Sequence, residues 1–214
     1  MYPKGNLFVP ASHGRLEAIL KEPRGEPKGV ALVSHPHPLG GGTMHNKVVF
    51  RAAAGLVDAG LITIRYNFRG VGASTGEHDE GNGEAQDVID VLDYLSQNYP
   101  DQNITHAGFS FGSHVGGAVA TGDARVTRLI SIGTPVDKYR DFDFLIGTEK
   151  PILFVHGDRD EFGSVASLEL LATKVSKSAS TKLVIFENCG HFFDEHLAQL
   201  RDTIRDWATE QIDG

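Results

Sequence analysis

The sequence predicts an α/β protein built on one mostly parallel sheet with helices on both faces. Two observations carry this prediction: short, continuous apolar runs recur along the chain, and segments with helically spaced apolar residues lie between them. Continuous apolar runs are typical of strands that are covered on both faces. Strands that alternate with helices form parallel sheets through right-handed crossovers. No repeat or linker interrupts the alternation, so we expect a single domain over residues 1–214.

The expected elements begin with a β-hairpin, residues 6–9 and 15–20, around a turn at Ser12-His13-Gly14. Further strands are expected at residues 30–33, 61–64, 104–109, 129–132, 151–155 and 183–186. Helices are expected at residues 46–59, 84–99, 112–121, 162–175 and 192–212. Gly60 and Pro100 follow the first two of these helices and are typical residues for ending them.

Composition excludes several classes of protein. Apolar residues make up 40% of the 214 residues and charged residues 22%, as in an ordinary globular chain. The net charge of −8 disfavours a nucleic-acid binder, which needs a basic face. No apolar run approaches the roughly 20 residues that span a bilayer, and residues 1–5 lack the apolar core of a secretory signal. The single cysteine, Cys189, excludes an internal disulfide and fits a reducing compartment. We therefore expect a soluble cytoplasmic enzyme without a membrane partner.

A possible nucleophile lies between an expected strand and an expected helix. Residues 108–112 read Gly-Phe-Ser-Phe-Gly, a G-x-S-x-G pattern centred on Ser110. A serine on a sharp strand-to-helix turn exposes its hydroxyl, and the flanking glycines let the neighbouring elements approach closely. The N–H of Phe111 would then face a developing oxyanion at the helix N-terminus. A flexible Gly/Ser turn is the alternative, but the position between a strand and a helix favours the nucleophile.

Candidates for the acid and the base follow in the order Ser, Asp, His that serine nucleophiles of this kind use. The strand that ends at residue 155 leads to two aspartates, Asp158 and Asp160. Asp160 is favoured as the acid because it lies further into the loop, whereas Asp158 could cap or brace the turn. His191 follows Gly190 after the last strand and is the candidate base.

Most of the other histidines have no spacing that indicates a function. His156 ends a strand and is expected beneath the acid loop, and His114 could line a pocket or support the turn at Ser110. No H-E-x-x-H or paired-cysteine pattern accompanies the histidines, so no metal site is expected.

The loop at residues 35–44 is the candidate for a second oxyanion donor. It reads His-Pro-His-Pro-Leu-Gly-Gly-Gly-Thr-Met, in which the prolines fix the entry and the glycines leave backbone N–H groups accessible. A phosphate-binding loop is the alternative, but no G-K-[ST] or G-x-G-x-x-G pattern occurs there.

Three segments together, residues 35–38, 67–74 and 108–112, resemble the small bacterial α/β-hydrolases related to dienelactone hydrolase. The resemblance covers nearly the whole chain. It implies the α/β-hydrolase fold with about eight strands, an acyl-enzyme mechanism and no cofactor. Asp160 and His191 match the acid and base positions of that group. Dienelactone hydrolase resembles a cysteine-nucleophile enzyme, whereas position 110 is serine, so dienelactone as the substrate does not follow.

Carried onto this chain, the oxyanion donors would be the N–H groups of Phe111 and His37. Pro36 stands where many relatives have glycine, so the second donor stays open, with Leu39 as the reserve candidate. Arg69 could bind a carboxylate substrate, but an arginine that braces its loop through backbone carbonyls is the favoured interpretation.

Fewer than 20 residues separate the strand that ends at residue 132 from the one that starts at 151, where larger relatives insert a lid. A minimal or absent lid predicts an open, shallow pocket. Its candidate residues are Leu39, Val136, Tyr139, Phe142, Phe144 and Leu145. The alternative is that the aromatic residues among them pack against the body or form a subunit contact.

The sequence thus predicts a serine hydrolase that cleaves short-chain carboxylic esters through an acyl-enzyme, acting as a monomer or homodimer. A thioesterase or a peptidase would use the same residues. The lack of an accessory domain argues against an oligopeptidase, and the complete Ser-Asp-His set argues against a non-catalytic binding module.

Overall fold

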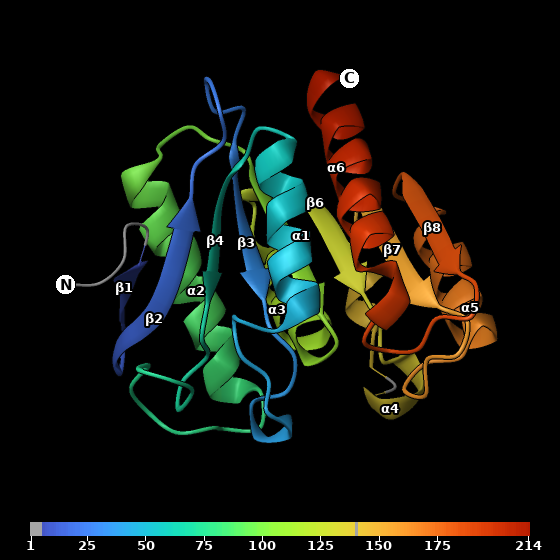
Figure 1. Cartoon of the computed structure of the whole chain (residues 1–214), viewed down its shortest axis with the longest axis horizontal. Helices are drawn as coiled ribbons and strands as arrows, with labels where there is room; N and C mark the ends of the chain where they lie inside the picture. Colours follow the sequence, from blue (N-terminus) through green and yellow to red (C-terminus); the bar gives the residue numbers. More distant parts are fainter. Residues whose placement is uncertain (1–5, 140) are drawn as a thin grey trace.

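The computed structural model describes residues 6–139 and 141–214 and is organised around one eight-stranded sheet (Figure 1). The strands are β1 (Asn6–Ala11), β2 (Gly14–Lys21), β3 (Val30–Ser34), β4 (Ile62–Tyr66), β5 (Ile104–Phe109), β6 (Val126–Ile132), β7 (Ile152–Gly157) and β8 (Thr181–Phe186). The main helices are α1 (Lys47–Asp58), α2 (Asn82–Asn98), α3 (Phe111–Gly122), α5 (Val165–Val175) and α6 (Leu197–Asp213). Every predicted strand and helix is present.

The sheet has the order β1-β2-β4-β3-β5-β6-β7-β8. The hairpin of β1 and β2 joins β4 in antiparallel register, and all other neighbours pair in parallel. The predicted α/β-hydrolase architecture with a mostly parallel sheet is confirmed. The parallel strands run toward the bottom of Figure 1, so their carboxyl ends meet at one edge of the molecule.

Helices cover both faces of the sheet and enclose two apolar cores. α1 and α6 lie together on one face, in front of the sheet in Figure 1. α2, α3 and α5 supply the buried residues on the other face. Strands β3, β5, β6 and β7 contribute to both cores, as expected for strands that are covered on both faces. β4 contributes to one core only, because Thr63 and Arg65 occupy its other face.

The α1–α6 contact depends on a glycine in the middle of α1. A Cβ atom at Gly55 would lie 2.5 Å from the backbone oxygen of Arg201 on α6. The two helices therefore pack backbone against backbone at this point, with Ile204 and Trp207 of α6 buried beside it.

Two predicted helices begin later than the sequence indicated. α5 begins at Val165 rather than at residue 162, because Ser164 caps it by accepting a hydrogen bond from the N–H of Ser167. α6 begins at Leu197 rather than at residue 192, because Phe193 has φ of 55° and a short 3₁₀ turn, Asp194–His196, comes first. Both corrections leave longer loops at the carboxyl edge of the sheet.

The connection from β6 to β7 holds only two short turns, α4 (Val136–Tyr139) and a 3₁₀ turn, Asp143–Leu145. Phe142 and Leu145 are buried against the body, as the alternative interpretation of this segment predicted. The prediction of a minimal lid is confirmed.

No helix in the described part of the chain combines the length and the apolar character needed to cross a membrane. The expectation that residues 1–5 form no secretory signal lies outside the described residues.

The Gly55 contact gives a stability prediction. We expect Gly55→Ala to lower the free energy of unfolding by about 1–3 kcal/mol, because the added Cβ forces α1 away from α6. The control is Gly122→Ala at the end of α3, where a Cβ meets nothing within 4 Å and should be neutral or stabilise by about 0.5 kcal/mol. Urea unfolding of both variants checks this; an unchanged midpoint for Gly55→Ala would contradict the close packing.

Candidate active site

Ser110 lies on the predicted sharp turn between β5 and α3, with φ of 54° and ψ of −119°. The turn needs both flanking glycines. A Cβ at Gly108 would lie 2.4 Å from the oxygen of Gly112, and a Cβ at Gly112 would lie 2.4 Å from the oxygen of Ser34 on β3. Such unfavourable backbone angles at a non-glycine residue are typical of functional sites, where the surrounding structure enforces them.

Asp160 and His191 are brought together at the carboxyl edge of the sheet, although 31 positions separate them in the sequence. His191 Nδ1 donates to Asp160 Oδ2 over 2.7 Å, and both side chains are buried. The second carboxylate oxygen, Oδ1, accepts the N–H of Phe162 at 2.9 Å. Because Nδ1 is bonded to the acid, the opposite ring nitrogen of His191, Nε2, is left for other chemistry.

The imidazole of His191 lies beside the turn that carries Ser110. Its ring centroid is 4.9 Å from that of Phe109, the residue before Ser110, and 4.6 Å from that of Phe162. A Cβ at Gly133 would lie 3.2 Å from the His191 ring. The N–H of Ser110 binds the oxygen of Ile132, so Ser110 and the His191 imidazole adjoin the same turn after β6. No hydrogen bond joins Ser110 Oγ to His191 within residues 6–139 and 141–214.

Asp158, the alternative acid, has a different environment. It is exposed, and its Oδ1 accepts the N–H of Cys189 at 3.0 Å, which ties the acid loop to the loop of His191. Hydrogen bonds from the backbone of Cys189 and Asn188 lower the pKa of Asp158. The structure therefore places Asp158 as a brace between the two loops and Asp160 against the imidazole.

Cys189 is buried within this braced region. Burial, with Asp158 and Asp160 nearby, raises the pKa of its thiol to about 11. A Cβ at Gly157 would lie 2.2 Å from the oxygen of Cys189, so the acid and base loops also touch through their backbones.

The two predicted oxyanion donors have free N–H groups. Phe111 is the first residue of α3, where a helix leaves its N–H groups without intrahelical partners. Within the described parts of the chain, the N–H groups of Phe111 and His37 donate to no protein atom. The N–H of Leu39, the reserve candidate, instead donates to His37 Nδ1 at 3.2 Å. Leu39 is thus engaged within its own loop.

His35 fixes this loop against the segment that follows β4. Its Nδ1 donates to the oxygen of Pro36 at 2.6 Å, and its Nε2 accepts the N–H of Phe68 at 3.0 Å. Burial lowers the pKa of His35 to about 4, so the ring is neutral at pH 7 and can serve as donor and acceptor at once.

The segment at residues 67–74 is a structural brace, as predicted. Asn67 accepts the N–H of Met44 at 2.8 Å and donates to Glu17 on β2 at 2.8 Å. Arg69 does not bind backbone carbonyls, contrary to the prediction. Its guanidinium donates to the buried carboxylate of Asp87 on α2 at 2.7 and 3.0 Å, so that charge is neutralised within the fold.

Imidazole and phenyl rings line the side of the site that the 35–44 loop forms. The His37 ring lies 4.8 Å from that of Phe111 and 5.0 Å from that of His78. Burial, with His78 and Lys138 nearby, lowers the pKa of His37. His78 Nδ1 is 2.7 Å from the buried Glu84. Nothing in the spacing of His78 and Glu84 marked them in advance.

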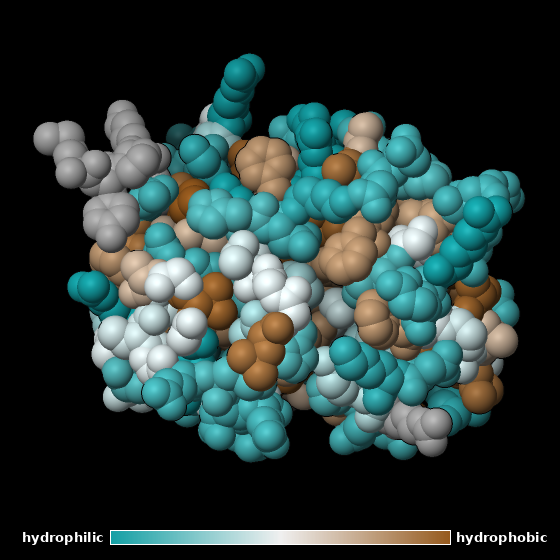
Figure 2. Space-filling view, turned by 60° about the horizontal axis from the view of Figure 1, so that its bottom comes forward, coloured by the Kyte–Doolittle hydropathy of each residue, from teal (hydrophilic) through white to brown (hydrophobic). Residues whose placement is uncertain are grey.

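Figure 2 turns this edge of the molecule forward. Apolar side chains gather on it in small, separate groups surrounded by hydrophilic residues. One cavity, of about 270 Å³, adjoins the turn at Ser110 and is lined by Phe111, His114 and Tyr139. Apolar residues of α3 and the polar Glu80 and Asn82 at the start of α2 complete its wall. Of the predicted pocket residues, Tyr139 lies in this wall. Phe144 packs against Gly117 of α3, and Leu39 is 77% exposed on the surface.

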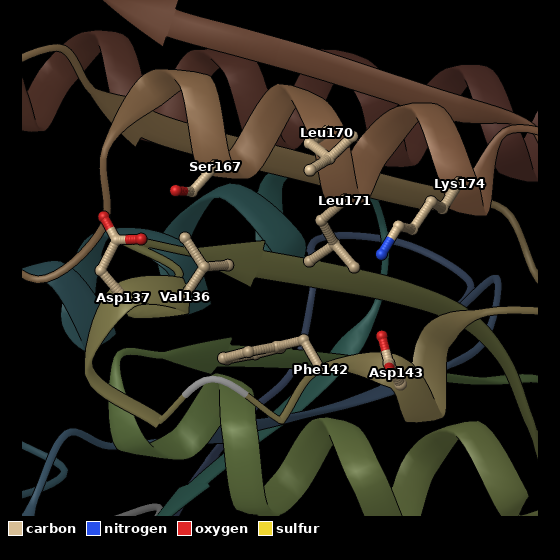
Figure 3. Close-up of a pocket in the computed structure, with 8 residues that line it drawn as sticks. All are labelled: Val136, Asp137, Phe142, Asp143, Ser167, Leu170, Leu171 and Lys174. Carbon is tan, nitrogen blue, oxygen red and sulfur yellow. The ribbon is translucent and has the colours of Figure 1, made fainter.

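A larger hollow, of about 450 Å³, lies away from Ser110, Asp160 and His191, between α5 and the β6–β7 connection (Figure 3). Leu170, Leu171 and Lys174 of α5 face Val136 and Phe142 across it. It contains none of the predicted catalytic residues. Groups of three or more His, Cys, Asp or Glu side chains that could hold a metal ion do not occur among the described residues.

The buried neutral histidines give a pH prediction. Burial lowers the pKa of His35 to about 4 and that of His106 to about 3. The unfolded chain binds protons at these residues near pH 6.5 whereas the folded chain does not, so stability falls as the pH decreases below 6.5. We expect the two histidines to remove about 2 kcal/mol between pH 6 and pH 5.

Urea unfolding at pH 7, 6 and 5 measures this loss. His106→Gln should remove about half of the loss, since each histidine contributes a similar slope above its folded pKa. The exposed His45 supplies the control variant His45→Gln, which should leave the pH dependence unchanged. Equal pH dependence in wild type and His106→Gln would show that His106 is not held neutral.

Comparison with known proteins places this geometry in a family. The family described as X-Pro dipeptidyl-peptidase (S15 family) matches residues 12–185. An uncharacterized protein of Rickettsia prowazekii is 34% identical over 208 residues, which cover 94% of this chain and 87% of that protein.

Solved structures of α/β serine hydrolases have the same fold as this chain. An α/β serine hydrolase homologue from Coxiella burnetii has a TM-score of 0.87 at 34% identity, covering 96% of this chain and 98% of that one. A member of the α/β serine hydrolases without a lid, from Xanthomonas campestris, has a TM-score of 0.86 at 29% identity, covering 99% and 96%. The resemblance to small bacterial α/β-hydrolases is thereby confirmed, and the chain belongs to the X-Pro dipeptidyl-peptidase (S15) family of proteins and is an α/β-hydrolase.

Proposed function

We propose that this hydrolase cleaves carboxylic esters of short acyl chains, with Ser110 as nucleophile, His191 as base and Asp160 as acid. The observation that carries the proposal is the 2.7 Å hydrogen bond between the buried Asp160 and His191, next to a serine with positive φ. The proposed chemistry uses only side chains and N–H groups of this chain.

The reaction begins when Ser110 Oγ attacks the acyl carbonyl carbon and His191 Nε2 accepts the hydroxyl proton. Asp160 stabilises the imidazolium that forms, through the bond to Nδ1. His191 then gives the proton to the departing alcohol, and the acyl-enzyme remains on Ser110. A water molecule that His191 deprotonates releases the acid and restores the serine.

The tetrahedral oxyanion would be held by the N–H groups of Phe111 and His37. Both lack a partner among the described residues, and each well-placed donor is worth about 3 kcal/mol of transition-state stabilisation. The N–H of Leu39, by contrast, already donates to His37 Nδ1. This arrangement favours His37 over Leu39 as the second donor.

The acyl chain would occupy the cavity beside Phe111, with Tyr139 in its wall. About 270 Å³ is less than the roughly 300–1,000 Å³ of pockets that enclose drug-sized ligands, which favours short chains. Leu39 and Phe144, two further predicted pocket residues, lie outside this cavity.

A second candidate function is hydrolysis of an X-Pro peptide bond, favoured by the family match over residues 12–185. The same nucleophile, base and oxyanion donors perform it. An assay with an X-Pro p-nitroanilide beside the esters compares the two substrates directly. A higher kcat/KM for the anilide would replace the ester proposal with the peptidase.

The nucleophile is tested with p-nitrophenyl esters from acetate to decanoate. We expect kcat/KM to be highest for the short members, and Ser110→Ala to lower it by about 10⁴-fold or more. Thr121→Val, near the end of α3, is the control because its hydroxyl donates to the oxygen of Gly117, away from the turn. Equal turnover by wild type and Ser110→Ala would refute the assignment.

The choice between the two aspartates is tested by matched substitutions. Asp160→Asn should lower kcat by about 10³–10⁴-fold, because the amide cannot stabilise the imidazolium. Asp158→Asn keeps an acceptor for the N–H of Cys189 and should stay within about threefold of wild type, equivalent to about 0.5 kcal/mol. The reverse pattern would make Asp158 the acid.

A further inference from the structure

A second histidine lies on the buried side of the proposed acid. His156 belongs to the end of β7, is fully buried, and is packed beneath the acid loop. It has no part in the mechanism above. Its two ring nitrogens make different contacts, one with the acid loop and one with the Asp160 carboxylate.

The first nitrogen closes the acid loop. His156 Nε2 lies 2.6 Å from the backbone oxygen of Gly163, and because a carbonyl only accepts, Nε2 must carry a proton. This bond joins the residue before the loop to the residue at its far end. Within the loop, the N–H of Asp160 binds the oxygen of Gly157. The His156 imidazole thus holds both ends of the loop 157–163, which carries Asp160.

The second nitrogen faces the carboxylate itself. His156 Nδ1 lies 3.7 Å from Asp160 Oδ2, the oxygen that receives His191. This distance exceeds that of a hydrogen bond. Nδ1 is buried, and within the described part of the chain it has no hydrogen-bond partner. A buried acceptor beside a carboxylate is unfavourable for both groups unless a proton lies between them.

Asp160 Oδ2 is therefore flanked by two imidazoles. The ionisable groups near them include His191 on the β8–α6 loop and the buried thiol of Cys189, which lies near Asp160. From α4, Asp137 Oδ2 accepts the N–H of Ser164 beside the acid loop, and Lys138 Nζ lies 4.9 Å over the Phe162 ring. Asp158 is turned away toward the N–H of Cys189. The single Asp160 carboxylate can balance only one buried imidazolium. Protonation of His156 therefore makes protonation of His191 less favourable, and the reverse.

We propose that His156 is a positioning residue for Asp160 with two roles. In its neutral form it holds the acid loop through Gly163 and leaves Asp160 Oδ2 to His191. When Nδ1 takes a proton, it attracts the same oxygen and weakens His191 as a base. The inference rests on the proposed function, since it requires Asp160 and His191 to act as acid and base.

Two substitutions separate the roles. His156→Gln places an amide donor where Nε2 was and has no group that titrates. We expect its kcat at pH 8 to stay within about threefold of wild type. Because only one of the two imidazoles takes a proton at a time, log kcat/KM should fall toward low pH with a slope of one in both proteins. The pH midpoint of this fall should be lower in His156→Gln, since only His191 can then be protonated.

His156→Phe keeps the ring but loses both contacts. We expect kcat to fall by about 10–100-fold with KM unchanged, because His156 touches no substrate and acts only on the placement of Asp160. The control is His45→Gln, an exposed histidine outside the acid loop. Its pH profile should match that of wild type.

A wild-type pH midpoint in His156→Gln would overturn the protonation role, and a wild-type kcat in His156→Phe would overturn the positioning role. If His156→Phe does not fold, as judged by circular dichroism, the Gln variant decides alone. If the wild type cleaves no ester or anilide, the proposed function fails instead. The low-field proton resonance of the His191–Asp160 bond then decides the inference: it should shift to a different pH midpoint in His156→Gln, and an unchanged midpoint overturns it.

Discussion

The close approach of β3, β5 and α3 beneath Ser110 is the contact on which the rest of the site depends. Three glycines permit it. Gly108 and Gly112 let the chain reverse against Ser34, and a Cβ at Gly116 would lie 2.4 Å from Nε2 of the buried His106. With the three elements this close, the residue at the turn has one available conformation, and it is one that most side chains avoid. The serine hydroxyl is lifted out of the sheet as a consequence.

Two groups of loops flank this turn, and each is held by bonds from side chains to backbone. On one side, His35 and Asn67 fix the 35–44 loop by binding the N–H groups of Phe68 and Met44. On the other side, Asp158 binds the N–H of Cys189 and His156 binds the oxygen of Gly163. Each of these hydrogen bonds holds a surface loop against its neighbours where the loop has no apolar core of its own.

Local patterns allowed much of this to be predicted. The hairpin, the parallel strands and the turn at Ser110 each follow from residue types within a few positions, and all are present. The order of strand, glycine and histidine along the chain was enough to select His191 as the candidate base. In the structure His191 is hydrogen-bonded to Asp160. The roles of these residues in catalysis stay predictions that only kinetics can test.

What the sequence could not supply were contacts between distant segments. Arg69 was assigned to backbone carbonyls because its partner, Asp87, is a helical residue that only the packing of α2 brings close. The start of α6 was placed too early because Phe193 has positive φ, which its residue type does not signal. His156 was expected beneath the acid loop, but its bond to Gly163 depends on how that loop closes.

The order of the site residues along the chain has a consequence for synthesis. Ser110 and its turn are specified by β3, β5 and α3, all of which leave the ribosome before β7 and β8. The proposed acid and base follow only these last two strands, and β8 forms the far edge of the sheet. Under the proposed function, Ser110 would have no base and no acid until residues 152–214 dock, so partially made molecules would carry no hydrolytic activity.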